Sequence, residues 1–214
     1  ELNPLFPITT ETGVEGIITV GGIALGGLAA QFGTPLYVYD AKSISIAFAR
    51  LKKPFNKYYP GDFQITYASK AYLSLKYAAK ICALGCSIDV VSLSELKFAL
   101  EAGFSPAKIH LHGNNKSEGE IRLAVNQGID AIVVDSLDEL NFVENICKEL
   151  NKKARIWLRL NTDVLVDTHK AIQTGHKASK FGISIGGSQA GLAVHQALSS
   201  RFVTLKGVHT HLGS

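Results

Sequence analysis

The sequence predicts an α/β protein in which strand–helix units repeat around a parallel sheet, and three observations support this fold class. Five short runs rich in Ile and Val begin 21 to 24 residues apart, as expected for strands buried on both faces. Each interval has room for one helix and two loops. Three of the intervals open with the helix-capping pattern Ser-x-x-Glu. The five predicted strands are 65–68, 87–91, 108–112, 131–135 and 155–160.

The predicted helices have clear starts and stops. In the capping pattern the serine side chain accepts a hydrogen bond from a free backbone N–H of the first turn, and the glutamate reaches back to the cap residue. Apolar residues at helical spacing follow each pattern, and Gly103 and Gly128 stand where helices commonly stop. The three pairs are Ser92 with Glu95, Ser117 with Glu120, and Ser136 with Glu139.

After the fifth strand the period breaks. Residues 161–180 are more polar and resemble a loop, which makes them candidates for function. A sixth strand is predicted at 207–212. Cys82 and Cys86 stand four residues apart, and we expect them to share one helix face as small core residues rather than metal ligands.

Two architectures fit such a series: a (β/α)8 barrel and a doubly wound sheet. The doubly wound sheet predicts a G-x-G-x-x-G turn after the first strand, whereas Ser69, Lys70 and Ala71 follow it here. The barrel is therefore favoured. With about six of eight strand–helix units in the sequence, we expect an incomplete barrel and a chain that is part of a longer protein.

Composition excludes several classes of protein. The chain has 214 residues, of which 46% are hydrophobic, and a net charge of +4, which argues against a disordered or fibrous chain. The basic residues form no tail or stripe, so no nucleic-acid partner is expected. The longest apolar stretch, near residues 21–30, is too short for a membrane span. Three cysteines, an odd number, favour a reducing compartment.

Titratable residues stand at the predicted strand ends, where a barrel gathers its chemistry. A lysine at the end of a buried strand is either a desolvated nucleophile able to form a Schiff base or a side chain that reaches solvent, and the pattern alone leaves both open. These residues are Lys70, Asp89, His110, His112, Asp135, Arg159, His209 and His211.

Two His-x-His pairs, 110–112 and 209–211, raise a metal-dependent hydrolase as an alternative, because alternate strand residues share one face. In barrel hydrolases of the usual pattern such a pair lies on the first strand, and here it does not. No metal site is therefore predicted.

The stretch Tyr67-Ala68-Ser69-Lys70-Ala71 resembles the Y-A-x-K-A signature of the alanine-racemase-like enzymes that use pyridoxal 5'-phosphate. Together with other segments in the same order it resembles the diaminopimelate decarboxylase branch of that family. The sequence departs from the family pattern at Tyr72, Thr162 and Lys170-Ala171. The other matching segments are 32–40, 89–96, 112–117, 168–175, 179–182 and 209–214.

The resemblance implies roles for five residues. Lys70 resembles the lysine that holds pyridoxal phosphate as a Schiff base and serves as the catalytic base and acid. Asp89 and Arg159 resemble residues that line the floor of the cofactor site and could pair with each other. His211 resembles a histidine that stacks on the cofactor ring, and Ser214 a serine near its phosphate.

The resemblance also implies an architecture. Residues 35–214 would form the pyridoxal-phosphate-binding barrel, truncated at its C-terminal end. Residues 1–34 would lead into that barrel and form part of, or pack on, a second β domain that lies mainly outside this chain. The full-length protein is expected to be a cytoplasmic homodimer, and the 214-residue piece alone is expected to be inactive.

The implied reaction is the last step of lysine biosynthesis, the decarboxylation of meso-2,6-diaminopimelate to L-lysine and carbon dioxide. The cofactor weakens the bond set perpendicular to its ring, so neighbours of the substrate decide which bond breaks. Two alternatives stay open. One is a decarboxylase of arginine, ornithine or a carboxylated polyamine, and the other is a regulator that binds pyridoxal phosphate without catalysis.

Overall fold

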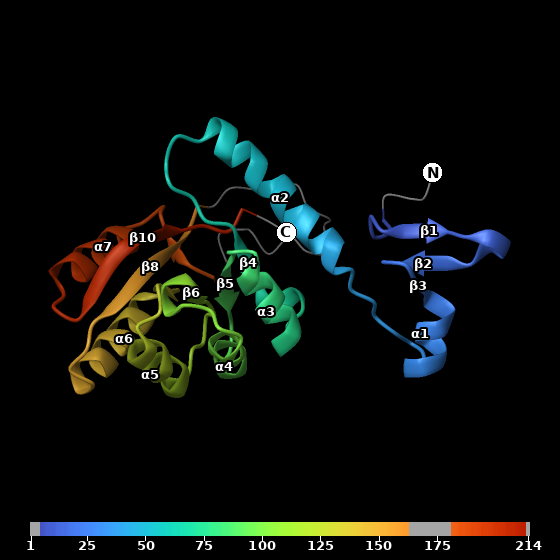
Figure 1. The fold of residues 1–214 in the computed structure, drawn as a ribbon. Coiled ribbons are helices and arrows are strands. Elements are labelled where there is room, and N and C mark those ends of the chain that lie inside the picture. The colour runs from blue at the N-terminus through green and yellow to red at the C-terminus, as the bar shows by residue number, and fades with distance from the viewer. Residues whose placement is uncertain (1–4, 163–180, 213–214) are drawn as a thin grey trace. The chain divides into compact units, whose positions relative to one another are not determined.

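The computed structural model describes residues 5–162 and 181–212 of the chain (Figure 1). By its internal contacts the chain divides into two units, residues 1–65 and 66–214. The predicted domain boundary after residue 34 stays a prediction. No helix in the described ranges is long and apolar enough to cross a membrane.

The first unit contains a small antiparallel sheet and two helices. The sheet has the strand order β1-β2-β3. Helix α2 begins where the Asp40 carboxylate accepts hydrogen bonds from the backbone N–H groups of Lys42 and Ser43, at 3.2 and 3.0 Å. The elements are β1 (Thr10–Thr12), β2 (Ile18–Val20), β3 (Ile23–Ala24), α1 (Leu25–Phe32) and α2 (Ala41–Tyr58).

The second unit alternates strands and helices. Its parallel strands follow the order β10-β8-β7-β6-β5-β4, and the short β9 pairs with the end of β8. The strands are β4 (Thr66–Ala68), β5 (Ser87–Val90), β6 (Ile109–Leu111), β7 (Ala131–Val134), β8 (Ala154–Asn161), β9 (Ile183–Ser184) and β10 (Val203–His209). The helices are α3 (Leu75–Ala83), α4 (Leu93–Glu101), α5 (Glu118–Gln127), α6 (Leu137–Glu149) and α7 (Gln189–Ser199).

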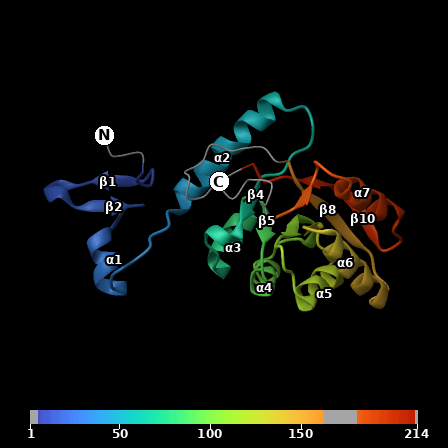
Figure 2. The same ribbon diagram turned by 180° about the vertical axis from the view of Figure 1, so that it is seen from behind.

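Each helix of this unit packs against the next one in sequence, from α3 to α7. Figures 1 and 2 show α3 to α6 following one another along one side of the curved sheet. This is the arrangement of a (β/α) barrel wall, in which each strand passes through a helix to its parallel neighbour.

The two faces of the strands differ in chemistry because successive side chains alternate. One face carries apolar residues that are fully buried with the helices: Ile88, Val90, Ile109, Leu111, Val134, Ile156 and Leu158. The other face brings together Asp89, His110 and Trp157, since His110 bonds to Asp89 and its ring centroid lies 4.4 Å from that of Trp157.

The predicted serine caps are confirmed for three helices, because each serine side chain accepts from the N–H of the glutamate three residues on: Ser92, Ser117 and Ser136. The reciprocal half of the pattern is present only at Ser117 and Glu120. The carboxylates of Glu95 and Glu139 instead accept from the N–H of the residue before the cap, at 2.8 and 2.7 Å.

These three glutamates also tie each strand–helix unit to the one before it. Each carboxylate accepts a hydrogen bond from the preceding unit at the carboxyl edge of the sheet. The donors are Ser69 Oγ to Glu95, the Leu93 N–H to Glu120, and Lys116 Nζ to Glu139. The edge where chemistry is expected is therefore cross-linked by charge-assisted hydrogen bonds.

Two expectations about elements are wrong. The sixth strand begins at Val203 and ends at His209, rather than spanning 207–212, because Val203 pairs with Ala154 and alternate residues of β10 are exposed. Cys86 lies outside a helix. Helix α3 ends at Ala83, and Gly85 then takes a φ of +83°, a conformation that ends helices.

Candidate cofactor site

Lys70 follows the first strand of the barrel wall. Strand β4 ends at Ala68, and Ser69–Ala71 form a single 3-10 turn that carries Lys70 beyond the strand end, where it is exposed. Ser69 is buried, and its hydroxyl donates to Glu95 Oε2 at 2.5 Å. The turn that carries Lys70 is thus attached to the first turn of helix α4.

Asp89 lies beside Lys70's strand. The parallel register pairs Asp89 with Ala68 on one side and with His110 on the other. The Asp89 carboxylate accepts a hydrogen bond from His110 Nδ1 at 2.9 Å, and His112 Nε2 lies 3.3 Å from the same oxygen. Burial opposes the charge, but these two histidines outweigh it and lower the pKa of Asp89 to about 2. Asp89 is therefore ionised at neutral pH.

The Asp89→Asn variant is expected to weaken the fold in a pH-dependent way. Because the pKa in the folded protein is about 2 against an ordinary 3.8, the carboxylate stabilises the fold above about pH 4, and this stabilisation is lost as pH falls through about 2. In urea unfolding of the full-length protein, the variant's free energy of unfolding should be about 2 kcal/mol lower than that of the wild type at neutral pH. This difference should shrink toward pH 2. The exposed Asp62→Asn change is the control, and an equal loss at every pH would contradict the assignment.

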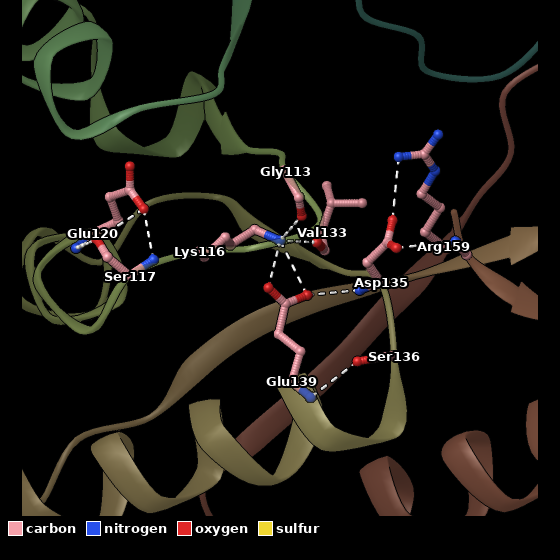
Figure 3. Close-up of polar contacts among 10 residues, drawn as sticks. Gly113, Lys116, Ser117, Glu120, Val133, Asp135, Ser136, Glu139 and Arg159 are labelled. Atoms are coloured by element: carbon pink, nitrogen blue, oxygen red, sulfur yellow. Dashed lines mark hydrogen bonds and ion pairs between the residues drawn. The ribbon is translucent and has the colours of Figure 1, made fainter. Parts of the chain in front are cut away.

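Arg159, in β8, pairs with Asp135, whereas the resemblance implied a possible pair with Asp89. Its Nη1 lies 3.1 Å from Asp135 Oδ1 (Figure 3). Its guanidinium lies 5.1 Å from the centre of the Phe181 ring. The second Asp135 oxygen accepts the N–H of Gly182 at 3.0 Å. The pair that the resemblance implied between Asp89 and Arg159 is not formed, because two histidines contact Asp89 and Asp135, directly after β7, contacts Arg159.

Two histidines lie at the C-terminal end of β10, His209 as its last residue and His211 just after it. Burial, with the nearby charges of Arg159 and Lys70, lowers the pKa of His211. Burial and neighbouring His112 lower the pKa of His209 to about 4, and the His209 and His112 ring centroids lie 4.9 Å apart. Lys70 and Arg159 thus both lie close enough to His211 to lower its pKa. Ser214, the fifth predicted site residue, lies outside the described residues.

The residues present fit pyridoxal phosphate. Lys70 carries its amine beyond the end of β4 at an exposed position, where a carbonyl group can reach it. His211 supplies an imidazole whose lowered pKa keeps it neutral at pH 7. His209 Nδ1 is buried without a hydrogen-bond partner among the described residues, so the strand ends retain an unused polar group. Arg159 supplies a fixed positive charge.

The His-x-His pairs act within this polar cluster. His110 and His112 both face Asp89, and His110 Nε2 lies 3.3 Å from Asp130 Oδ2. No cluster of three or more potential metal ligands occurs among the described residues. His110 is a buried histidine inside strand β6, with only 2% of it exposed.

Comparison with known proteins identifies the family. Residues 42–214 match the family model described as pyridoxal-dependent decarboxylase, pyridoxal binding domain. The chain belongs to this family. Its cofactor is therefore pyridoxal phosphate, as the Tyr67–Ala71 motif predicts.

Individual pyridoxal-dependent decarboxylases are similar over nearly the whole chain. Diaminopimelate decarboxylase of Bacillus methanolicus is 42% identical over 206 residues, which cover 96% of this chain and 48% of that protein. The enzyme of the same name from Bacillus subtilis is 40% identical, over 96% of this chain and 47% of that protein. The chain thus spans about half the length of these relatives.

Solved structures agree with the predicted fold. A crystal structure of diaminopimelate decarboxylase from M. jannaschii matches with a TM-score of 0.89 at 35% identity, covering 97% of this chain and 48% of that one. The Helicobacter pylori enzyme with L-lysine matches with a TM-score of 0.77 at 32% identity, covering 88% and 47%. These matches confirm the α/β barrel class and show that the described sheet is part of such a barrel.

Several residues around the site were not predicted to act there. The tie between Ser69 and Glu95 and the pairing of Asp135 with Arg159 depend on contacts between strand–helix units, which spacing along the chain does not reveal. Lys116 was noted only within a matching segment. A signal was present, because a lysine two residues before a helix start is poorly placed for the positive end of the helix dipole.

Gly182 joins the segment after residue 180 to the site. Its φ is +79°, and an added Cβ would lie 3.2 Å from Arg159 O and from Asn161 N. Gly182→Ala is expected to cost about 1–2 kcal/mol for the backbone conformation and more for the contacts. Gly85→Ala is the matched control, since its φ is +83° with nothing within 4 Å. Equal urea midpoints for the two variants would contradict the close approach at Gly182.

Proposed function

We propose that the full-length protein is a diaminopimelate decarboxylase that converts meso-2,6-diaminopimelate to L-lysine and carbon dioxide. One observation carries the proposal. Lys70 follows the end of strand β4, where its charge and that of Arg159 both act on His211, in a chain 42% identical to the Bacillus methanolicus enzyme over 206 residues. Structures of the M. jannaschii and Helicobacter pylori enzymes with L-lysine support the identity of the product.

Lys70 and His211 would have different roles toward the cofactor. Lys70 would bind the cofactor carbonyl through its amine, release it to the substrate amine, and then hold or return a proton. When bound, pyridoxal phosphate accepts the electron pair left by the departing carboxylate. The neutral imidazole of His211 can lie against the cofactor ring and shield it from water without adding charge.

Asp89 and Arg159 are charged residues held in place by their neighbours. Asp89 keeps its negative charge because His110 and His112 hold it. Arg159 keeps its position because Asp135 and Phe181 hold its guanidinium from two sides. Preorganised charges of this kind need no rearrangement when the substrate arrives.

The test is release of carbon dioxide by the full-length protein from meso-2,6-diaminopimelate, with ornithine, arginine and a carboxylated polyamine as competing substrates. We expect turnover with the first and much slower release from the others. Preference for one of the others would replace the substrate. Bound cofactor with no carbon dioxide from any of them would support the non-catalytic regulator.

We also propose that the full-length protein is a homodimer in the cytoplasm. The three cysteines are free, and two of them are buried, which supports a reducing compartment. Sedimentation equilibrium of the full-length protein tests the assembly, and a monomer at micromolar concentration would contradict it.

A further inference from the structure

A buried lysine lies beside the candidate site without belonging to it. Lys116 is in the loop between β6 and α5, and only 1% of its side chain is exposed. Its ammonium group donates to Gly113 O at 2.5 Å, to Val133 O at 2.6 Å and to the Glu139 carboxylate at 2.9 and 3.1 Å. Lysine is rarely buried unless it is paired, so this ammonium is fully used in holding its surroundings.

Glu139 links Lys116 to Asp135. Its Oε2 accepts the backbone N–H of Asp135 at 2.7 Å while both oxygens bind Lys116 (Figure 3). Its own N–H donates to Ser136 Oγ at 3.1 Å. The backbone of Asp135 is thus fixed at the end of β7 by a carboxylate that is itself fixed.

The side chain of Asp135 is held in place as well as its backbone. Only 7% of it is exposed, and its two carboxylate oxygens serve different partners. Oδ1 pairs with Arg159, and Oδ2 accepts the N–H of Gly182. Because Phe181 precedes Gly182 and lies against the Arg159 guanidinium, Asp135 restrains that guanidinium directly and through the ring.

We propose that Asp135 is a positioning residue for Arg159, and that the buried Lys116–Glu139 pair is the anchor that holds Asp135 in place. The four side chains run from the positive Lys116 through the negative Glu139 and Asp135 to the positive Arg159. The inference rests on the proposed role of Arg159 toward the cofactor. Asp135 itself acts only through Arg159 and the segment at Gly182.

The test measures cofactor binding rather than turnover. In the full-length protein, Asp135→Asn keeps the size of the side chain and removes its charge. We expect the dissociation constant of pyridoxal phosphate, from titration of the cofactor-free protein, to rise about tenfold, which corresponds to about 1.4 kcal/mol. Glu118→Gln is the control. It weakens an exposed ion pair with Arg122 on helix α5 and should leave the dissociation constant unchanged.

A double-mutant cycle separates positioning from a general loss of structure. If Asp135 acts through Arg159, then Asp135→Asn should change the dissociation constant little once Arg159→Met is present. The same tenfold loss in both backgrounds, or no loss in either, would overturn the proposal. The outcome is independent of the proposed reaction, because a protein that binds the cofactor without decarboxylating diaminopimelate still reports on the cycle.

Discussion

The Lys70→Ala variant of the full-length protein is expected to lose at least about 10⁵-fold in kcat/KM for meso-2,6-diaminopimelate. That factor is the lower range of the advantage that a well-placed intramolecular group holds over one in solution. The expectation follows from the position of Lys70 on a short turn after β4, which Ser69 and Glu95 anchor, and from its electrostatic effect on His211. Carbon dioxide release in the steady state measures it.

The matched control is Lys76→Ala. Lys76 is an exposed lysine on helix α3, six residues after Lys70, and its removal should leave kcat/KM within a factor of two of the wild type. Circular dichroism of both variants shows whether each is folded. A folded Lys70→Ala variant that keeps a tenth of the wild-type rate would contradict the role given to Lys70.

The second large effect concerns stability. Removing the buried ammonium in Lys116→Met is expected to lower the free energy of unfolding by about 3–5 kcal/mol, because Glu139 then keeps a charge with no buried partner. Two backbone carbonyls, those of Gly113 and Val133, also lose their donor. Urea unfolding of the full-length protein at neutral pH measures the loss.

Removing both charges should cost less than removing one. In Lys116→Met combined with Glu139→Gln, no unpaired charge stays buried, and the glutamine oxygen can still accept the Asp135 N–H. Lys152→Met is the surface control, since Lys152 bonds to Asn126 at an exposed position, and it should change stability by less than about 0.5 kcal/mol. A double variant less stable than Lys116→Met alone would contradict this account of the pair.

Much of the fold could be predicted from the sequence. The strands β5 to β8 are buried runs that read clearly as strands, and the serine caps and the glycines at 103 and 128 marked helix limits correctly. Strand β10 was misplaced because its residues alternate between buried and exposed, which is a weaker signal than a continuous apolar run. Helix α7 has no Ser-x-x-Glu pattern and contains Gly191, so no local sequence pattern predicted this helix.

The partners within the site were harder to predict. The sequence placed Asp89 and Arg159 at strand ends, but the choice of partner depends on register and on the direction in which each side chain points. The register sets Asp89 beside His110, and Arg159 meets Asp135 at the end of β7. The glutamates at the helix starts were expected to cap only their own helices, whereas their carboxylates also accept hydrogen bonds from the preceding unit.

We propose that Lys70 is the residue that holds the cofactor. Borohydride reduction of the full-length protein loaded with pyridoxal phosphate, followed by proteolysis and peptide mass measurement, tests it most directly. We expect one modified peptide with the added mass on Lys70, and an unmodified peptide that contains Lys116. Modification at Lys116 or another lysine, with Lys70 unmodified, would contradict it.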